Sequence, residues 1–303
     1  MTAQLGLGTY RCRDVTAAAQ AAVTAGVGVI DTAPVYAAGT AQRQLGPLLR
    51  HHPDVRVTTK IGHMTTAQAE DARKANAITA HEAARRHCIS PRYIVHQLAA
   101  NRAELCRERL DLVYLHNPEH HANGDRAQLL TRLTASFEVF EQAAHAGHIT
   151  GYGVATWIGL SSRAFTITDL ITAARAAAGG SGIHLRAVQF PVNLVQLRAT
   201  AEALHGRGPI IHAEQVGLEV WASAPLHGGE LVGMVNGELA AAIDARLSPV
   251  QAALAVVGST PGLTGAFLSA STAAHWNEAL SAFAQPPLSP EHLEAVCRVL
   301  RAH

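Results

Sequence analysis

Short apolar runs alternate along the chain with longer, alanine-rich segments whose apolar positions recur at helical spacing. Compact apolar runs of this kind are typical of strands that are buried on both faces of a parallel sheet. The pattern predicts strands at Leu5–Thr9, Val27–Asp31, Val55–Lys60, Leu110–His116, Ile149–Thr156, Arg186–Pro191, Leu218–Ala222 and Leu263–Ser269.

The alanine-rich segments predict helices at Val15–Ala25, Tyr93–Arg107, Leu129–Ala146, Ile167–Ala178 and Pro249–Val257. Start signals precede three of them, at Asp14, Ser90-Pro91 and Ser248-Pro249. Glycines stand where three helices should end, at Gly26, Gly147 and Gly217. The long connection from Gly62 to about Ser90 carries a further predicted helix at Thr66–Ala75.

Eight strands that alternate with helices indicate a parallel α/β architecture. No change in composition and no linker interrupts the alternation, which favours one closed (β/α)8 TIM barrel over a doubly wound sheet. No G-x-G-x-x-G lies between a strand and a helix, because Gly6-Leu7-Gly8 lacks the third glycine. We therefore expect residues 1–303 to form a single barrel domain.

Composition limits the function. Of 303 residues, 48% are hydrophobic and 16% charged, which excludes a disordered or disulfide-stapled chain. A net charge of +1 offers no attraction for nucleic acid or an anionic membrane. No secretory signal is visible, apolar runs fall far short of the roughly 20 residues of a membrane span, and the four cysteines share no C-x-x-C spacing. We expect a cytoplasmic protein.

Ionisable groups end three predicted strands, at Asp31, Lys60 and His116, and Tyr36 lies in the first loop after Asp31. Catalytic groups of a (β/α)8 barrel sit at these carboxyl ends. A phenol has a pKa of about 10, and a nearby ammonium lowers it by favouring phenolate. A carboxylate is needed to keep a buried lysine charged, which Asp31 is placed to do. Taken alone, Asp31 and Lys60 also fit a purely structural ion pair.

Several motifs of the chain, in the same order, resemble those of the aldo-keto reductase family: Leu5-Gly-Leu-Gly-Thr9, Ile30-Asp-Thr-Ala33 with Tyr36, Gln44-Leu-Gly46, Thr59-Lys60, Asp111-Leu-Val-Tyr-Leu-His-Asn117, Gly153-Val-Ala155 and Val188-Gln189. Three more resemble one bacterial and plant branch of that family: Tyr114-Leu-His-Asn-Pro-Glu119, Tyr152-Gly-Val-Ala-Thr-Trp157 and Ser259-Thr-Pro-Gly262. The resemblance runs from about residue 5 to 280.

The resemblance implies reversible hydride transfer between a nicotinamide cofactor and a small carbonyl or alcohol substrate. It implies Tyr36 as general acid, Lys60 and Asp31 as the groups that tune it, and His116 as the group that orients the carbonyl. Tyr36 and His116 would line the substrate site. Trp157 follows the fifth predicted strand, where an aromatic ring either forms a wall of that site or packs in the core. Implied cofactor contacts are Thr9, Thr156, Gln189, Ser223, Leu226, Ser271, His275 and Glu278. The expected cofactor is NADP(H), with NAD(H) as the alternative.

Departures from the family pattern keep two alternatives open. Ala41-Gln42 replaces a Ser-Glu pair, Ser223 replaces an aromatic residue that stacks on nicotinamide, and Ser271 stands near the position of a cation for the 2′-phosphate. The same tyrosine–lysine pair would serve a non-redox dehydration or isomerisation, and a regulatory subunit would bind cofactor without turnover. The sequence indicates no oligomeric state.

Histidines after the predicted strands raise the question of a metal. His116 to His120 match H-x-x-E-H literally, but the segment follows a strand and contains Pro118, whereas that motif needs a helix. We therefore predict no metal site. His63, His120 and His121 fall in loops at the predicted active face, where they contact either substrate or solvent.

Overall fold

A computed structural model describes residues 3–122, 124–180 and 182–301. Its eight strands form a closed barrel in sequence order, which confirms the predicted (β/α)8 TIM-barrel fold. The strands are β1 (Gln4–Gly8), β2 (Val29–Asp31), β3 (Arg56–Ile61), β4 (Leu110–His116), β5 (Ile149–Ala155), β6 (Leu185–Pro191), β7 (Glu219–Ser223) and β8 (Gly265–Leu268).

The α-helices are α1 (Val15–Thr24), α2 (Ala41–His51), α3 (Thr66–Lys74), α4 (Ala80–Arg85), α5 (Pro91–Glu104), α6 (Arg126–His145), α7 (Ile167–Ala178), α8 (Arg198–Leu204), α9 (Gly208–Gln215), α10 (Leu231–Met234), α11 (Gly237–Asp244), α12 (Pro249–Gly258), α13 (Ala273–Ala284) and α14 (Pro290–Arg301). Three short 3-10 turns are η1 (Ala37–Gly39), η2 (Pro118–His121) and η3 (His227–Gly229). The chain divides into two compact units, Asp31–Val188 and Met1–Ile30 with Gln189–His303. The predicted single domain stays a prediction.

Two of the three predicted start signals form side-chain caps, whereas Ser90 makes no capping hydrogen bond and Pro91 alone begins α5 as expected. Asp14 accepts a hydrogen bond from the backbone of Ala17, and Ser248 forms a reciprocal cap with Gln251. Gly26, Gly147 and Gly217 have φ values of 85°, 73° and 80°, a left-handed conformation that glycine adopts without strain. These residues therefore end their helices for the predicted reason.

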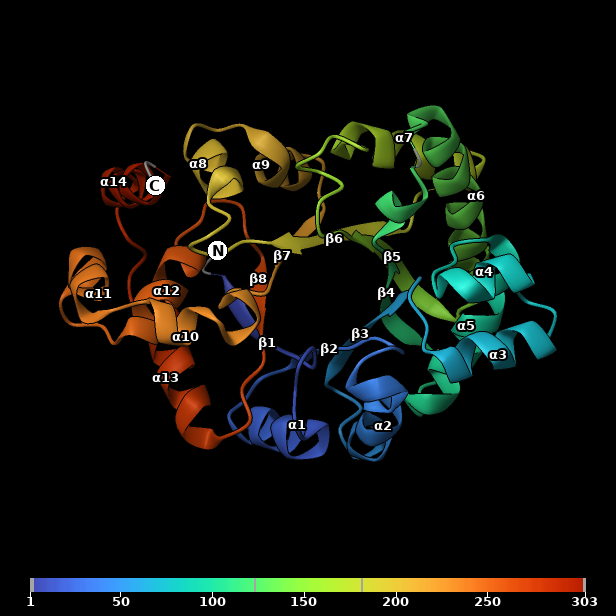
Figure 1. Ribbon diagram of the computed structural model, residues 1–303, viewed down its shortest axis with the longest axis horizontal. Coiled ribbons are helices and arrows are strands. Elements are labelled where there is room, and N and C mark those ends of the chain that lie inside the picture. Colours follow the sequence, from blue (N-terminus) through green and yellow to red (C-terminus); the bar gives the residue numbers. More distant parts are fainter. Residues whose placement is uncertain (1–2, 123, 181, 302–303) are drawn as a thin grey trace. The chain divides into compact units, whose positions relative to one another are not determined.

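In the unit Asp31–Val188, helices α2, α5 and α6 lie outside strands β3 to β5 (Figure 1). The strands pair in parallel, with Lys60 opposite Tyr114 and His116 opposite Ala155. Phe140 of α6 stacks on Tyr152 of β5. This pairing places the carboxyl ends of three adjacent strands side by side.

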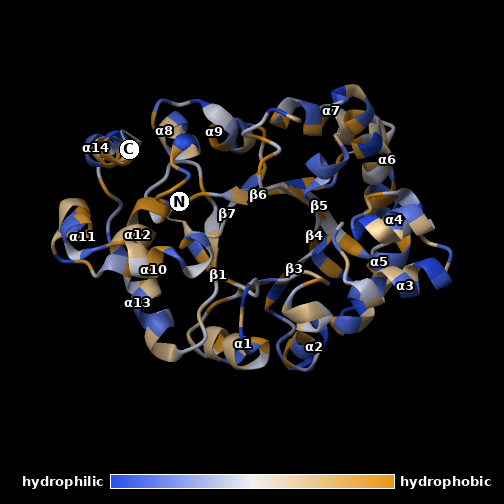
Figure 2. Cartoon of the chain, in the orientation of Figure 1, coloured by the Kyte–Doolittle hydropathy of each residue, from blue (hydrophilic) through white to orange (hydrophobic). Residues whose placement is uncertain are grey.

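In the other unit, β8 pairs in parallel with both β1 and β7. Trp221 and Phe267 stack with ring centroids 4.4 Å apart. The apolar helix α12 is largely buried, and Figure 2 shows its hydrophobic colouring. Among the described residues, no single helix is long and apolar enough to cross a membrane; a bent pair, α11 with α12, passes that test by length and composition alone.

Candidate active site

Lys60, the next-to-last residue of β3, is a buried ammonium. Its side chain is 1% exposed, and its Nζ donates to Asp31 Oδ2 at 2.5 Å and to the Thr32 carbonyl at 3.0 Å. Asp31 also accepts a hydrogen bond from the Thr58 hydroxyl at 2.7 Å. Burial lowers the pKa of Lys60 and the charge of Asp31 opposes that shift. The predicted ion pair is therefore present and desolvated.

The predicted acid and the predicted orienting group lie beside this ammonium. Lys60 Nζ is 5.1 Å from the centroid of the Tyr36 ring, and the rings of Tyr36 and His116 meet edge-on at 6.3 Å. Ala37 and Ala38 take left-handed φ values of 47° and 52°, so the chain turns sharply after Tyr36. The structure thus brings Asp31, Tyr36, Lys60 and His116 together in one unit.

A buried network of polar side chains holds the backbone of Lys60 in place. Gln42 is 1% exposed, accepts from the Thr59 hydroxyl and donates to Asn101. Asn101 in turn donates to the backbone carbonyl of Lys60 at 3.2 Å. The departure noted at Gln42 therefore has a structural role, because its amide offers both a donor and an acceptor to neighbours in β3 and α5.

His116 lies in a crowded group of imidazoles. Burial, Lys60 and the rings of His63, His87 and His120 all lower its pKa, which lies well below the usual range of histidine. Burial lowers the pKa of His63 to about 4 and that of His87 to about 2. The rings of His63, His87 and His116 are therefore neutral at neutral pH, each with one N–H and one lone pair.

A chain of hydrogen bonds fixes two of the rings. Arg132 Nη1 approaches His121 Nδ1 at 3.3 Å, His121 Nε2 lies 2.9 Å from His87 Nδ1, and His87 Nε2 lies 2.7 Å from the carbonyl oxygen of His116. A guanidinium only donates and a carbonyl only accepts. Both imidazoles therefore carry their proton on Nε2, and His87 holds the end of β4.

The predicted cofactor contacts divide between the two units. Thr156 lies in Asp31–Val188, and the other seven lie in the other unit, so their grouping around one cofactor stays a prediction. Thr9 and Gln189 are buried after β1 and within β6, and Ser223 ends β7. Ser271 and His275 are exposed at the start of α13, whereas Glu278 accepts from the Ser248 hydroxyl.

A model of the Aldo/keto reductase family matches residues 2–301. The chain belongs to the aldo/keto reductase family. A D-threo-aldose 1-dehydrogenase from Pseudomonas sp is 26% identical over 148 residues, which span 46% of this chain and 43% of that protein.

Two solved aldo-keto reductases from Klebsiella pneumoniae share the fold. One, in complex with NADP and acetate, has a TM-score of 0.69, and the other, in complex with NADPH, a TM-score of 0.65. Each is 22% identical, and each comparison covers 98% of this chain and 90% of the solved one.

Sequence reasoning about this aldo/keto reductase missed two buried groups. Glu119 is 8% exposed, and its Oε1 accepts from the Thr156 hydroxyl and from the backbone N–H groups of Trp157 and Ile158. It thereby holds the loop that carries Trp157, whose side chain is 43% exposed rather than part of the core. The other is His87, 4% exposed, which no local motif marks.

Proposed function

We propose that the protein is an NADP(H)-dependent oxidoreductase that interconverts a small carbonyl compound and its alcohol. The observation that carries the proposal is the buried Lys60 ammonium, held by Asp31 and lying 5.1 Å from the Tyr36 ring. An ammonium at this range stabilises the phenolate of Tyr36 relative to the phenol. A tyrosine in that setting can release and recover a proton near neutral pH.

In the reducing direction, Tyr36 Oη gives its proton to the carbonyl oxygen, and solvent returns a proton to the phenolate after product leaves. His116 donates a hydrogen bond from its neutral ring to the same oxygen and so orients the carbonyl. When bound, the reduced nicotinamide supplies the hydride that the carbonyl carbon receives. Alcohol oxidation follows the same path in reverse, with Tyr36 as the base.

Each of the two units, taken by itself, offers groups that suit part of a nicotinamide cofactor. Thr156 Oγ1 donates to Glu119 and accepts from the backbone of Gly159, which leaves one of its two lone pairs for a carboxamide N–H. Helix α13 has Thr272 as its cap, His275 in its first turn and no acidic residue there. A phosphate is favoured at such a helix start, and the similarity to solved reductases in complex with NADP or NADPH supports NADP(H) as the cofactor.

The substrate that we propose is a small, polar hydroxyaldehyde or its alcohol. Imidazoles from three segments, those of His63, His116 and His120, lie side by side near Tyr36. Such groups donate and accept hydrogen bonds, so they favour hydroxyl-bearing substrates over alkyl ones. The D-threo-aldose dehydrogenase that matches about half of this chain acts on substrates of that kind, which makes aldoses the first compounds to assay.

Fluorescence titration with NADPH and NADH tests the proposal, followed by turnover of a reactive hydroxyaldehyde. We expect NADPH to bind more tightly than NADH, and Tyr36→Phe to abolish turnover with nearly unchanged cofactor affinity. Tyr93→Phe is the matched control, because it removes the hydroxyl of another buried tyrosine, one that donates to Gln97 on α5. Failure of both cofactors to bind at millimolar concentration would refute the oxidoreductase, and binding without turnover of any carbonyl would favour a regulatory subunit.

The proposed setting is the cytoplasm. Cys12, Cys88 and Cys106 are free thiols, which supports a reducing compartment. Alkylation of all three in protein extracted without reductant is the expected result, and a disulfide at any of them would contradict it.

A further inference from the structure

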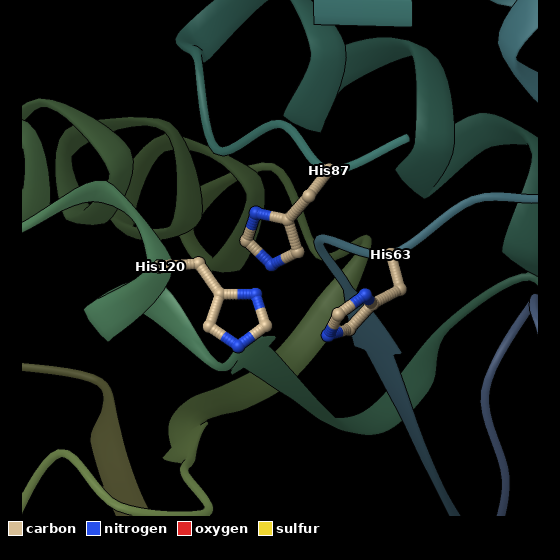
Figure 3. A group of neighbouring side chains, drawn as sticks. All are labelled: His63, His87 and His120. Atoms are coloured by element: carbon tan, nitrogen blue, oxygen red, sulfur yellow. The ribbon is translucent and has the colours of Figure 1, made fainter. Parts of the chain in front are cut away.

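Three imidazoles converge beside the candidate active site, as Figure 3 shows for His63, His87 and His120. One ring nitrogen of each lies within 4.8 Å of a ring nitrogen of both others. The ring centroids are 4.4 to 5.1 Å apart. His63 in turn lies 4.7 Å from the ring of His116.

The fold fixes this arrangement from three separate segments. His63 and His87 form an antiparallel bridge at the two ends of the excursion that contains α3 and α4. Backbone hydrogen bonds from Met64 to Arg86 and from Cys88 to Gly62 close that bridge. His120 comes from η2, whose start Asn117 takes a left-handed φ of 50°. The backbone of these three segments therefore sets where the three histidines lie.

We propose that His63, His87 and His120 bind one divalent transition-metal ion of the Zn²⁺ class. Neutral imidazole is the ligand that Zn²⁺, Co²⁺, Ni²⁺ and Cu²⁺ share. Three protein ligands leave one tetrahedral position for water or a substrate oxygen. The proposal departs from the sequence-based expectation of no metal, which considered only His116 and His120 on one segment.

The hydrogen bonds of the cluster show what binding must change. The amide of Asn117 donates to His63 Nε2 at 3.1 Å, so that nitrogen is unprotonated, and a metal ion bound there would replace the amide as its partner. His120 is exposed, so its ring can turn toward the ion. Metal–nitrogen bonds of about 2.0–2.1 Å require the three nitrogens to draw closer than they are here.

His87 exchanges one partner for another on binding. Its Nε2 now donates to the carbonyl of His116, so metal binding at Nε2 breaks that hydrogen bond, requires the ring to turn away from the carbonyl oxygen and moves the ring proton to Nδ1. His121 Nε2, 2.9 Å away, then accepts that proton's hydrogen bond after its own proton moves to Nδ1. His121 Nδ1, now protonated, can no longer accept from Arg132 at 3.3 Å. In return His87 donates to His121, which is the hydrogen bond from the second ring nitrogen that metal-bound histidines usually make.

A second group, Glu141, His145 and His184, serves as the internal control. The Glu141 carboxylate accepts from the Tyr152 hydroxyl and from both the backbone N–H and the ring of His184. Those hydrogen bonds occupy it, so we expect no tight site there.

Visible absorption of Co²⁺, titrated into the untagged, chelator-treated protein, tests the proposal without reference to turnover. We expect one tetrahedral Co²⁺ per chain, displaced by Zn²⁺, and an affinity at least about tenfold weaker in both His63→Ala and His120→Ala. His145→Ala should bind Co²⁺ as the wild type does. Circular dichroism of each variant checks that it is folded.

Two results would overturn the proposal. One is the lack of any tetrahedral Co²⁺ signal in the wild-type protein. The other is a signal that survives in folded His120→Ala and His63→Ala, or that disappears in His145→Ala. Because the readout is a metal spectrum, it stands apart from the test of the oxidoreductase, which is cofactor binding and Tyr36-dependent turnover.

Discussion

The two lysines of the chain offer a matched pair of perturbations. Lys60 is buried with Asp31 at 2.5 Å, whereas Lys74 is exposed and lies 3.9 Å from Asp71 one helical turn away. Lys60→Met removes the ammonium but leaves a desolvated carboxylate, which costs about 3–5 kcal/mol of unfolding free energy. Lys74→Met breaks only a solvated pair, worth roughly 0–0.5 kcal/mol.

The double variant Asp31→Asn/Lys60→Met separates charge from packing. It removes both buried charges, and replacing a buried ion pair often leaves the stability unchanged. Most of the unfolding free energy that Lys60→Met loses should therefore return. Turnover should not return. A unit charge 5.1 Å from the Tyr36 ring contributes about 3 kcal/mol at an effective dielectric constant of ~20, which corresponds to a loss on the order of 100-fold.

Urea unfolding followed by tryptophan fluorescence, together with NADPH-dependent turnover, measures both effects. The reasoning fails if Lys60→Met unfolds within about 1 kcal/mol of the wild type, or if the double variant is as unstable as the single one. It also fails if Lys74→Met loses activity to the same extent as Lys60→Met.

Three further predictions concern the same unit. Glu119→Ala removes the acceptor of three hydrogen bonds and should lower the unfolding free energy by roughly 3–4 kcal/mol, with Glu119→Gln milder; equal stability of wild type and alanine variant in urea would contradict this. Burial alone would raise the pKa of Asp169, but Thr166 and Arg126 lower it overall, so the carboxylate stabilises the fold above its ordinary pKa of 3.8 and that stability is lost as pH falls below it. The urea midpoints of wild type and Asp169→Asn should therefore converge in acid, and a gap that persists there would exclude this linkage. Gly46→Ala places a Cβ 2.5 Å from the Glu104 carbonyl oxygen and should lower the unfolding free energy by about 1–3 kcal/mol. Gly28→Ala is the control, because the space around Gly28 is open. If both variants unfolded at the same temperature, the predicted clash at Gly46 would be contradicted.

The barrel was predictable because its determinants are local. Strand Leu110–His116 and helix Ile167–Ala178 have the predicted boundaries, since a strand buried on both faces is a continuous apolar run and a helix repeats its apolar face at fixed spacing. A predicted strand boundary is wrong where the apolar run extends beyond the residues that pair with the neighbouring strand. The predicted strand Val27–Asp31 begins at Val29, because Val27 bonds back to Ala22 at the end of α1.

The candidate site was predictable only in part. Asp31 and His116 end strands and Lys60 is next to the end of one, and the strand ends of one barrel meet at one face whatever the loops do. Their grouping in one unit therefore follows from the fold. His87 joins them through a bridge to His63 across 24 residues, and Gln42 reaches Thr59 and Asn101 from another helix. Such contacts depend on how loops and helices pack, for which a single sequence carries no periodic signal.

Desolvation links the two functional proposals. A buried charge near His116 persists where an opposite charge stabilises it, as Asp31 does for Lys60, whereas burial lowers the pKa of His63 and His87 and leaves both rings neutral, each with one N–H. A phenol beside the stabilised cation becomes a usable acid, and neutral rings clustered together become metal ligands. Both chemistries therefore depend on the same exclusion of water around His116, so a change that admits water there should impair Tyr36-dependent turnover and Co²⁺ binding together.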